Sequence, residues 1–323
     1  MSAPSRAVRI VAVPLMLLAG GLVACQSQIN GELADALGGG ASAGIAAAVI
    51  SFGTGLVLLV AVVLRLPSAR AGVVRIADGV RHGRIQWYEL MGGLFGAYLV
   101  TTQGVTIGTI GVALFSVAVT AGQSASGLLV DHLGIGPSGR QSLSVPRAVA
   151  AAFAVAAVVL AAGERLVQTF SLQTAVFALL PLLAGAGAAL QLALNGRLSG
   201  VGGSWAATLN NFVLGLLGLL AALAVSLLLG GTLEGLPSTW WLYAGGPMGV
   251  GFIWLAATLV KVHGVLVLGL SIIAGQVMTA ELIELLGSST HVGIVGVAAG
   301  ALTVVGVLVA LLVRPAARRD QHV

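Results

Sequence analysis

The side chains best suited to chemistry in this sequence are carboxamides set within long apolar stretches. Gln26 and Asn30 stand four residues apart, so in a helix they lie on one face. A carboxamide donates and accepts hydrogen bonds without carrying charge. In hydrocarbon such a group is costly unless it faces a cavity or another polar group. The pattern therefore predicts a neutral, hydrogen-bonding lining for the path of a small solute.

The same residue types recur in the second half of the chain. The stretch LLAGGLVACQSQINGEL at 17–33 matches LLAGAGAALQLALNGRL at 182–198, and a later stretch of each half adds one more glutamine. The predicted substrate-binding residues are thus six amides: Gln26, Asn30, Gln123, Gln191, Asn195 and Gln276. The alternative is structural, because amides that bond across helices also hold a bundle together, with about 0.6 kcal/mol for each bond.

Acidic residues are scarce within the apolar stretches. Glu281 is the deepest of them and is the first choice for a proton carrier. The alternative is that Glu281, like Asp131 and Glu284, caps or flanks a helix at the membrane interface. No two histidines have metal-ligand spacing on one helix, the single Cys25 supports no metal cluster, and nucleotide-binding and hydrolase motifs are missing. The sequence predicts no enzyme, no metal and no cofactor.

The composition is that of a membrane protein. Apolar residues make up 58% of the chain and charged residues 8%, whereas soluble domains carry about 25% charged residues. A polar surface cannot be built from so few charges, so lipid must cover the outside of the molecule. The net charge of +5 does not indicate nucleic acid, because no basic face with interleaved aromatics occurs.

Ten apolar stretches have the length that a helix needs to cross a bilayer of about 30 Å. They predict an all-α polytopic membrane protein with spans at 11–34, 43–64, 88–107, 110–131, 145–162, 175–195, 205–229, 240–259, 263–284 and 291–313. The third and fourth spans are nearly contiguous, so the number of spans is hardest to determine from the sequence in this hairpin.

The basic residues are distributed unequally between the two sides of these spans. Both termini and every second loop hold 14 of the 15 Lys and Arg residues, and the opposite side holds only Arg165. Because basic residues stay in the cytoplasm, both termini are predicted to be cytoplasmic in an inner-membrane protein. The 65–86 loop carries five arginines, which suit topology and contact with anionic lipid heads.

The internal repeat divides the chain into two halves, 1–164 and 165–323, of five spans each. An odd number of spans makes the second half inverted, with a pseudo-two-fold axis in the membrane plane. Alternating-access transporters have this architecture, with sites near the midplane between the repeats. Residues 22–25 also mimic a lipoprotein cleavage site, but a cleaved signal has no reason to be part of a repeat.

Several motifs resemble one family. They are Gln26-x-x-x-Asn30, Ser51-Phe52-x-x-Gly55, Gly92-Gly93-x-x-Gly96, and Gly122-Gln123 with Gly127 and Asp131, and the second half carries the same set. The chain resembles the drug/metabolite transporter superfamily, specifically its YdcZ-like branch, as a fused pair of units. This resemblance implies a ten-helix fold that moves small metabolites or drugs, usually outward. One departure is that small multidrug exporters of the superfamily use a glutamate buried in the first helix, where this chain has Gln26 and Asn30.

The leading functional hypothesis is a secondary transporter that exports a small organic solute by alternating access. The rival classes are a non-transporting scaffold or lipid-binding protein, and an uncoupled facilitator. The expected partners are the solute and membrane lipids, without nucleic acid. The sequence leaves the substrate, the coupling ion and the formation of a homodimer open.

Overall fold

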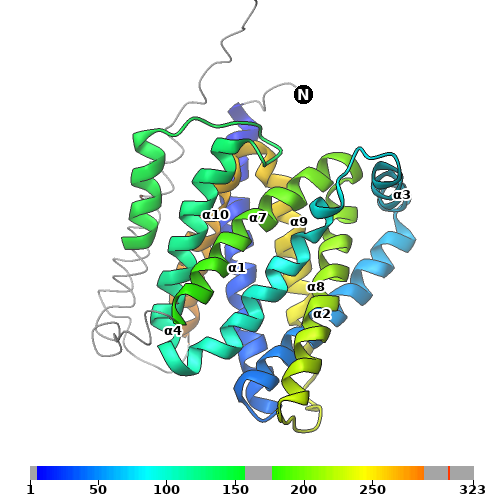
Figure 1. Cartoon of the computed structure of the whole chain (residues 1–323), viewed down its shortest axis with the longest axis vertical. Coiled ribbons are helices and arrows are strands. Elements are labelled where there is room, and N and C mark those ends of the chain that lie inside the picture. The colour runs from blue at the N-terminus through cyan, green and yellow to red at the C-terminus, as the bar shows by residue number, and fades with distance from the viewer. Residues whose placement is uncertain (1–5, 157–176, 287–304, 306–323) are drawn as a thin grey trace, which may run out of the picture.

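The computed structural model describes residues 6–156, 177–286 and 305. Within these residues the chain forms helices and loops without strands (Figure 1). The elements are α1 (Arg6–Ala36), α2 (Gly40–Arg65), α3 (Pro67–Arg81), η1 (Trp87–Met91), α4 (Gly92–Leu133), the helix Val145–Ala156, α7 (Leu179–Gly202), α8 (Ser204–Leu228), η2 (Trp240–Tyr243), α9 (Gly245–His263) and α10 (Val265–Leu286).

Five stretches of the described helices are long and apolar enough to cross a bilayer on their own: Val11–Ala36, Gly40–Arg65, Leu179–Gly202, Ser204–Leu228 and Trp240–His263. Large apolar side chains project outward from them, including Val57, Leu64, Leu217 and Val225, all more than half exposed. Such outward apolar faces suit lipid and not water. The prediction of an all-α polytopic membrane protein is confirmed.

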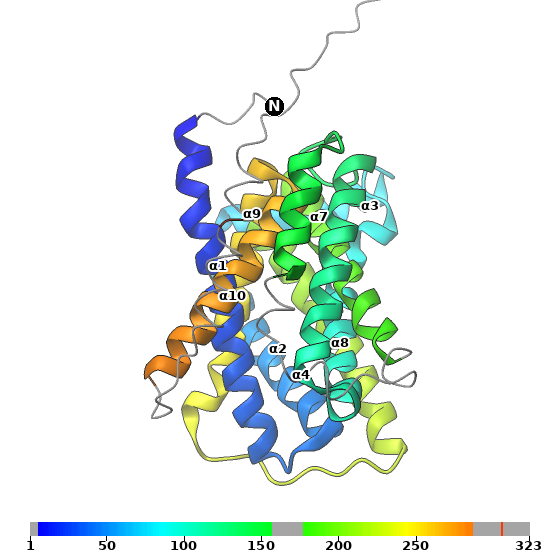
Figure 2. The same ribbon diagram turned by 90° about the vertical axis from the view of Figure 1, so that its left-hand side faces the viewer.

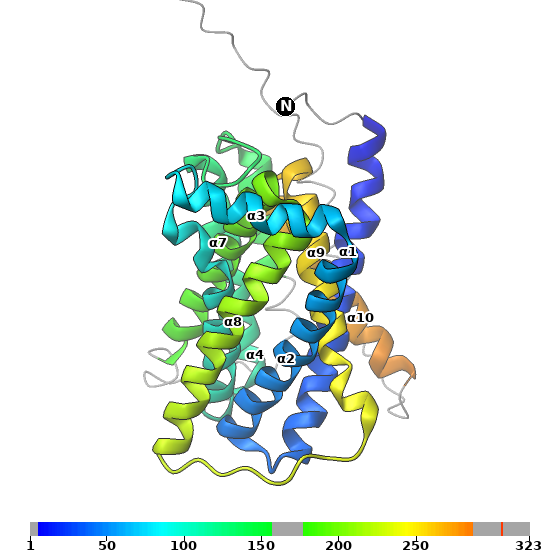
Figure 3. The ribbon, with the colours of Figure 1, turned by 90° about the vertical axis from the view of Figure 1, so that its right-hand side faces the viewer.

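The bundle has two distinct ends. At one end, here called the arginine-rich end, α2, α4, α7 and α9 finish, and α3 lies across the bundle (Figure 3). At the other end, here called the opposite end, α1 finishes and the 229–239 loop crosses, with the amide of Glu234 donating to the carbonyl of Leu37 at 2.9 Å. α1 therefore runs away from the arginine-rich end, whereas α7 runs toward it (Figures 1 and 2).

The two halves exchange equivalent contacts. Gly20 of α1 packs directly against the backbone carbonyl of Ile272 in α10, and its repeat mate Gly185 of α7 packs in the same way against Val119 of α4. Neither glycine has room for a Cβ, which is how glycine allows helix backbones to approach closely in membranes. The first helix of each half thus packs on the fourth helix of the other half, as inverted repeats require.

Two phenylalanines make equivalent contacts between the second helices of the two halves. Phe52 of α2 packs against Gly215 of α8, and Phe212 of α8 packs against Gly55 of α2. The two rings face each other with centroids 4.8 Å apart and an interplanar angle of 31°. Phe52 and Phe212 are repeat mates, so this pair lies where the pseudo-two-fold axis passes between the halves.

α4 is helical throughout its 42 residues but is not straight. Phe95 lies against Gly187, and Val119 lies against Gly185, only two residues away on α7. In a straight helix Phe95 and Val119 would be about 36 Å apart, at about 1.5 Å per residue. The helix therefore reverses between them, at the opposite end (Figure 1). Its two legs correspond to the predicted spans 88–107 and 110–131.

Helix α3 is absent from the sequence prediction, which treats 65–86 as a loop. It begins at Pro67 and buries Ala69, Gly72, Ile76 and Gly79 against the bundle. These four residues follow the three-to-four spacing of an amphipathic helix, and that spacing is the signal that could have revealed it.

Two arginines of the 65–86 segment have protein partners: Arg84 pairs with Asp78, and Arg75 binds the end of α7. Arg75 donates from Nε to the carbonyl of Val201 at 2.9 Å and from Nη2 to that of Gly202 at 3.1 Å. A cation at these last carbonyls caps the end of α7 and matches its dipole.

Three expectations fall partly or wholly outside the described residues. The fifth span, predicted at 145–162, is described only as Val145–Ala156, and the tenth, at 291–313, lies outside apart from residue 305. The predicted boundary between the halves at 164 also lies outside the described residues.

Candidate functional site

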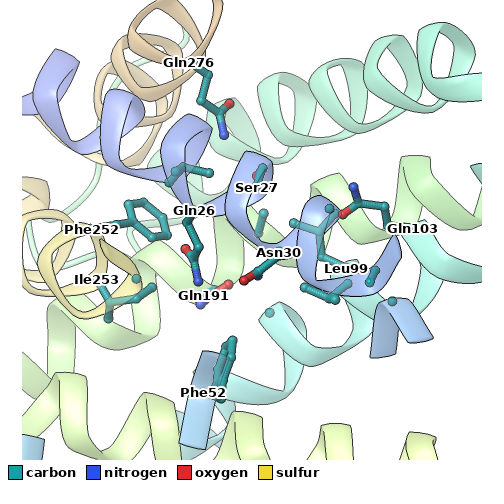
Figure 4. Close-up of a pocket in the computed structure, with 18 of the residues that line it drawn as sticks. Gln26, Ser27, Asn30, Phe52, Leu99, Gln103, Gln191, Phe252, Ile253 and Gln276 are labelled. Carbon is teal, nitrogen blue, oxygen red and sulfur yellow. The ribbon is translucent and has the colours of Figure 1, made fainter. Parts of the chain in front are cut away.

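A cavity of about 760 Å³ lies at the interface between the two halves (Figure 4). Five of the six predicted amides line it: Gln26, Asn30, Gln123, Gln191 and Gln276. They come from α1, α4, α7 and α10, so both repeats contribute to one space. The lining continues along the end of α1 to Asp35 and into the start of α2 at Gly40, both of which are exposed. The cavity therefore reaches the opposite end of the bundle.

The amides of the second half form a buried cluster around Asn211. Nε2 of Gln191 donates to Oδ1 of Asn211 at 3.0 Å, and Nδ2 of Asn195 donates to the same oxygen at 2.8 Å. In the first half Ser51 occupies the place of Asn211, and Nε2 of Gln26 donates to its Oγ at 3.3 Å. The two halves thus hold their glutamines by equivalent bonds, but the second half does so with more polar groups.

Glycines of the third helix in each half make room for these amides. A Cβ placed on Gly249 would lie 2.6 Å from Nε2 of Gln26, and one on Gly96 would lie 3.1 Å from Nε2 of Gln191. A Cβ on Gly92 would likewise lie 2.6 Å from Oδ1 of Asn195. The glycine pattern therefore allows polar side chains, as well as helix backbones, to fit between the halves.

The remainder of the lining is apolar and aromatic. Phe52, Phe212 and Phe252 contribute rings from α2, α8 and α9. The lining contains no basic side chain, and its single carboxylate is the exposed Asp35. Among the described residues, His, Cys, Asp and Glu side chains do not gather into a group that could hold a metal. The space suits an uncharged molecule with both polar and apolar parts.

Hydrogen-bonding capacity is left over at this site. In the described part of the chain, Oδ1 of Asn30, Oδ1 of Asn195 and Nδ2 of Asn211 are buried without a partner. An unsatisfied buried polar atom costs about 1–3 kcal/mol. Asn30 is the one of these three residues that also lines the cavity, so a polar group of a bound solute could relieve that cost after a small side-chain rotation.

The predicted residues do not all occupy equivalent places. Asn195 is buried beside Gly92 and does not line the cavity, so it reaches the site only through the Asn211 cluster. Glu281 lies in α10, but its side chain is outside the described residues, and its role as a proton carrier stays a prediction. Asp131 does cap a helix, as expected for the interfacial acids, although it is almost fully buried.

Sequence reasoning missed several lining residues. Ser27 and Gln103 both line the cavity and are exposed to it, and neither has a polar mate in the other half. Their mates are Leu192 and Ala256, so an argument based on repeated polar residues could not find them. The phenylalanines are ordinary in an apolar helix, and only their arrangement around the cavity marks them.

The fold and site define a multi-pass membrane protein with two inverted repeats around one cavity. Two segments, 11–160 and 176–313, each match the family model described as "Putative inner membrane exporter, YdcZ". The chain belongs to this family, and it is a multi-pass inner-membrane protein of the transporter class. The two matches correspond to the two halves that share the amide motifs.

Comparison with solved structures supports the same fold. A structure described only as "Crystal structure of protein" matches with a TM-score of 0.67 and 18% sequence identity, over 95% of this chain and 97% of the other. At that identity the likeness extends to the fold alone. Among curated proteins, none matches the chain.

Proposed function

We propose that this protein is a secondary transporter that exports a small organic solute through the cavity between its halves. One observation carries the proposal: five amides from both repeats line a single space of about 760 Å³ that reaches one end of the bundle. A scaffold has no need for an amide-lined cavity within a membrane, because polar groups in hydrocarbon are costly.

The proposed solute is uncharged, with hydrogen-bonding groups and an apolar or aromatic part. Carboxamides at Gln26, Gln191 and Gln276 offer both donors and acceptors. The phenylalanines offer apolar surface for the rest of the molecule. Anionic solutes are disfavoured because the described lining contains no Lys, Arg or His.

The proposed mechanism is alternating access with the site near the membrane midplane. The positive-inside rule would place the arginine-rich end in the cytoplasm. The cavity would then open to the outside, and solute would leave from this state. Each half makes equivalent contacts with the other half, and this supports the proposal. Inverted repeats can swap their conformations, so that the cavity closes at one end of the bundle and opens at the other.

Flux measurements in liposomes test the proposal. A thermal-shift screen of a metabolite library identifies a ligand first, since binding raises the melting temperature by mass action. We expect the purified protein to move that ligand across the bilayer, at a rate that an imposed ion gradient changes. Binding without flux would favour the scaffold or lipid-binding class, and flux that ignores every gradient would favour an uncoupled facilitator.

Proton coupling, if a pH gradient proves to be the driving force, has a named candidate in Glu281. The residue stands in α10, nine residues after the cavity-lining Ile272 and five residues after Gln276. The variant Glu281→Gln would then keep ligand binding and lose the response to the pH gradient. Unchanged coupling in that variant would remove Glu281 from the mechanism.

A further inference from the structure

The cavity is open on one side of the pseudo-two-fold axis and closed on the other. Ala34 lines the cavity and is partly exposed, whereas its repeat mate Ser199 is only 3% exposed and does not line it. Gln103 is exposed, whereas its mate Ala256 is 3% exposed. Positions that line the cavity on one side of the axis thus correspond to buried positions on the other side.

The closed side is filled by a short loop that follows α4. Gly196, the mate of the exposed Gly31, is buried against Pro137 and Val260. A Cβ on Gly196 would lie 2.7 Å from Cγ of Pro137. Oγ of Ser138 donates to the carbonyl of Val260 at 2.7 Å and fastens this loop to the end of α9.

Asp131 fastens the end of α4 to the start of α10. Its Oδ1 accepts a hydrogen bond from the amide of Val265 at 2.9 Å, and its Oδ2 accepts one from that of Leu266 at 3.0 Å. Arg147 pairs with the same carboxylate. The carboxylate is buried, at the positive end of the α10 dipole, which favours an anion.

The backbone of Asp131 also holds the loop that fills the closed side. Its carbonyl accepts a hydrogen bond from the amide of Gln141 at 2.7 Å, which closes the loop that contains Pro137 and Ser138. One residue therefore joins three parts of the arginine-rich end: the end of α4, the loop after it, and the start of α10 from the other half. Figure 1 shows these parts meeting there.

We propose that Asp131 is the latch of a second vestibule at the arginine-rich end, through which solute enters the site in the alternate state. The walls of this vestibule are mates of the open lining, including Gly196, Ser199 and Ala256, which are all buried. This inference rests on the proposed transport function and adds the residue that controls one side of it. Asp131 does not line the present cavity, so it acts by positioning α10 and the loop.

Cysteine labelling tests the latch without a known substrate. In a Cys25→Ser background, Ser199→Cys reports the closed vestibule and Ser27→Cys reports the open cavity. The probe is a soluble maleimide on purified protein in detergent, where both ends are accessible. Asp131→Asn weakens the cap and breaks the ion pair, so we expect labelling of Ser199→Cys to rise at least about tenfold, the effect of a shift of about 1.4 kcal/mol.

The second reporter separates gating from unfolding. Alternating access requires Ser27→Cys to label more slowly when Ser199→Cys labels faster, whereas general loosening would speed both. The double variant Asp131→Asn, Arg147→Gln leaves no buried charge at the pair and should shift the two rates in the same opposite directions. An unchanged rate at Ser199→Cys, or a rise at both positions, would overturn the proposal.

A disulfide across the latch gives an independent measurement. A Cβ on Gly136 would lie 3.2 Å from Cγ2 of Val265, so Gly136→Cys and Val265→Cys can reach the separation of about 3.5–4.5 Å between Cβ atoms that a disulfide needs. We expect oxidation to stop flux of the screened ligand and a reductant to restore it. Full flux in the oxidised protein would contradict the latch, whereas failure of the transport proposal itself would appear as absent flux in the reduced protein.

Discussion

The amide of Gln26 lies against Gly249, which has no Cβ. A Cβ at this position would lie only 2.6 Å from Nε2 of Gln26. Gln191 stands in the same relation to Gly96, at 3.1 Å. In each pair the amide belongs to one half and the glycine to the other. Neither half alone contains a complete copy of the site, so the two repeats must assemble before the cavity exists.

An alanine at Gly249 should damage the site more than the fold. Its Cβ would meet the mobile end of Gln26 and not a backbone, so the amide should be displaced while the helices stay in place. We expect Gly249→Ala to weaken ligand affinity about tenfold, measured by titration of the thermal shift. The control is Gly53→Ala, because a Cβ on Gly53 meets nothing within 4 Å. Equal affinities in the two variants would contradict the assignment.

Alanines at Gly20 and Gly185 should have the reverse effect. Each Cβ would run into a backbone carbonyl, of Ile272 or Val119, that cannot move without separating two helices. We expect each variant to lose about 1–3 kcal/mol of stability, the range typical of overpacking. Thermal unfolding in detergent measures this, again beside Gly53→Ala. If both variants unfold at the temperature of the unmodified protein, the glycine contacts between the halves are wrong.

The orientation of the bundle gives a third prediction. Ser68 in α3 and Ser238 in the loop before η2 are both exposed and lie at the two ends of the bundle. In a Cys25→Ser background, we expect an impermeant maleimide outside intact cells to label Ser238→Cys and to leave Ser68→Cys unlabelled until the membrane is opened. The reverse pattern would place the arginine-rich end outside and would invert the proposed direction in which the cavity faces.

Much of the fold follows from hydropathy and the repeat. The predicted spans 11–34 and 43–64 lie inside α1 and α2, because long apolar stretches in a membrane have little choice but to be helical. α7 continues to Gly202, beyond the predicted end at 195, because Asn195 and Ser199 are buried in the bundle. Polar residues lower the mean hydropathy of a segment even where they are buried. A span predicted from hydropathy therefore ends too early when the last turns of its helix carry buried polar side chains.

The sequence predicts the residues of the candidate site only where both halves contribute equivalent residues to the cavity. The repeat identifies Gln26 and Gln191 together, but it gives no reason to separate Asn30, which lines the cavity, from Asn195, which does not. That difference arises because the bundle is open at one end and closed at the other, an asymmetry that a repeated motif does not encode. The latch at Asp131 depends on a contact between residues 134 positions apart, which no local pattern reveals.

The affinities of three leucine variants show whether the amide-lined cavity binds the transported solute. Gln26→Leu and Gln191→Leu remove lining amides from the two halves. Gln28→Leu is the matched control, because Gln28 is exposed on the same helix as Gln26, donates to Glu32 at 2.8 Å, and does not line the cavity. All three variants are compared by melting temperature without ligand and by equilibrium affinity for the ligand found in the thermal-shift screen.

We predict that Gln26→Leu and Gln191→Leu lose affinity by about tenfold or more, with melting temperatures close to that of Gln28→Leu, since each removes about one hydrogen bond to the solute. If instead both variants melt at lower temperature while the folded protein keeps its full affinity, the amides only hold helices together, and the cavity is not the binding site.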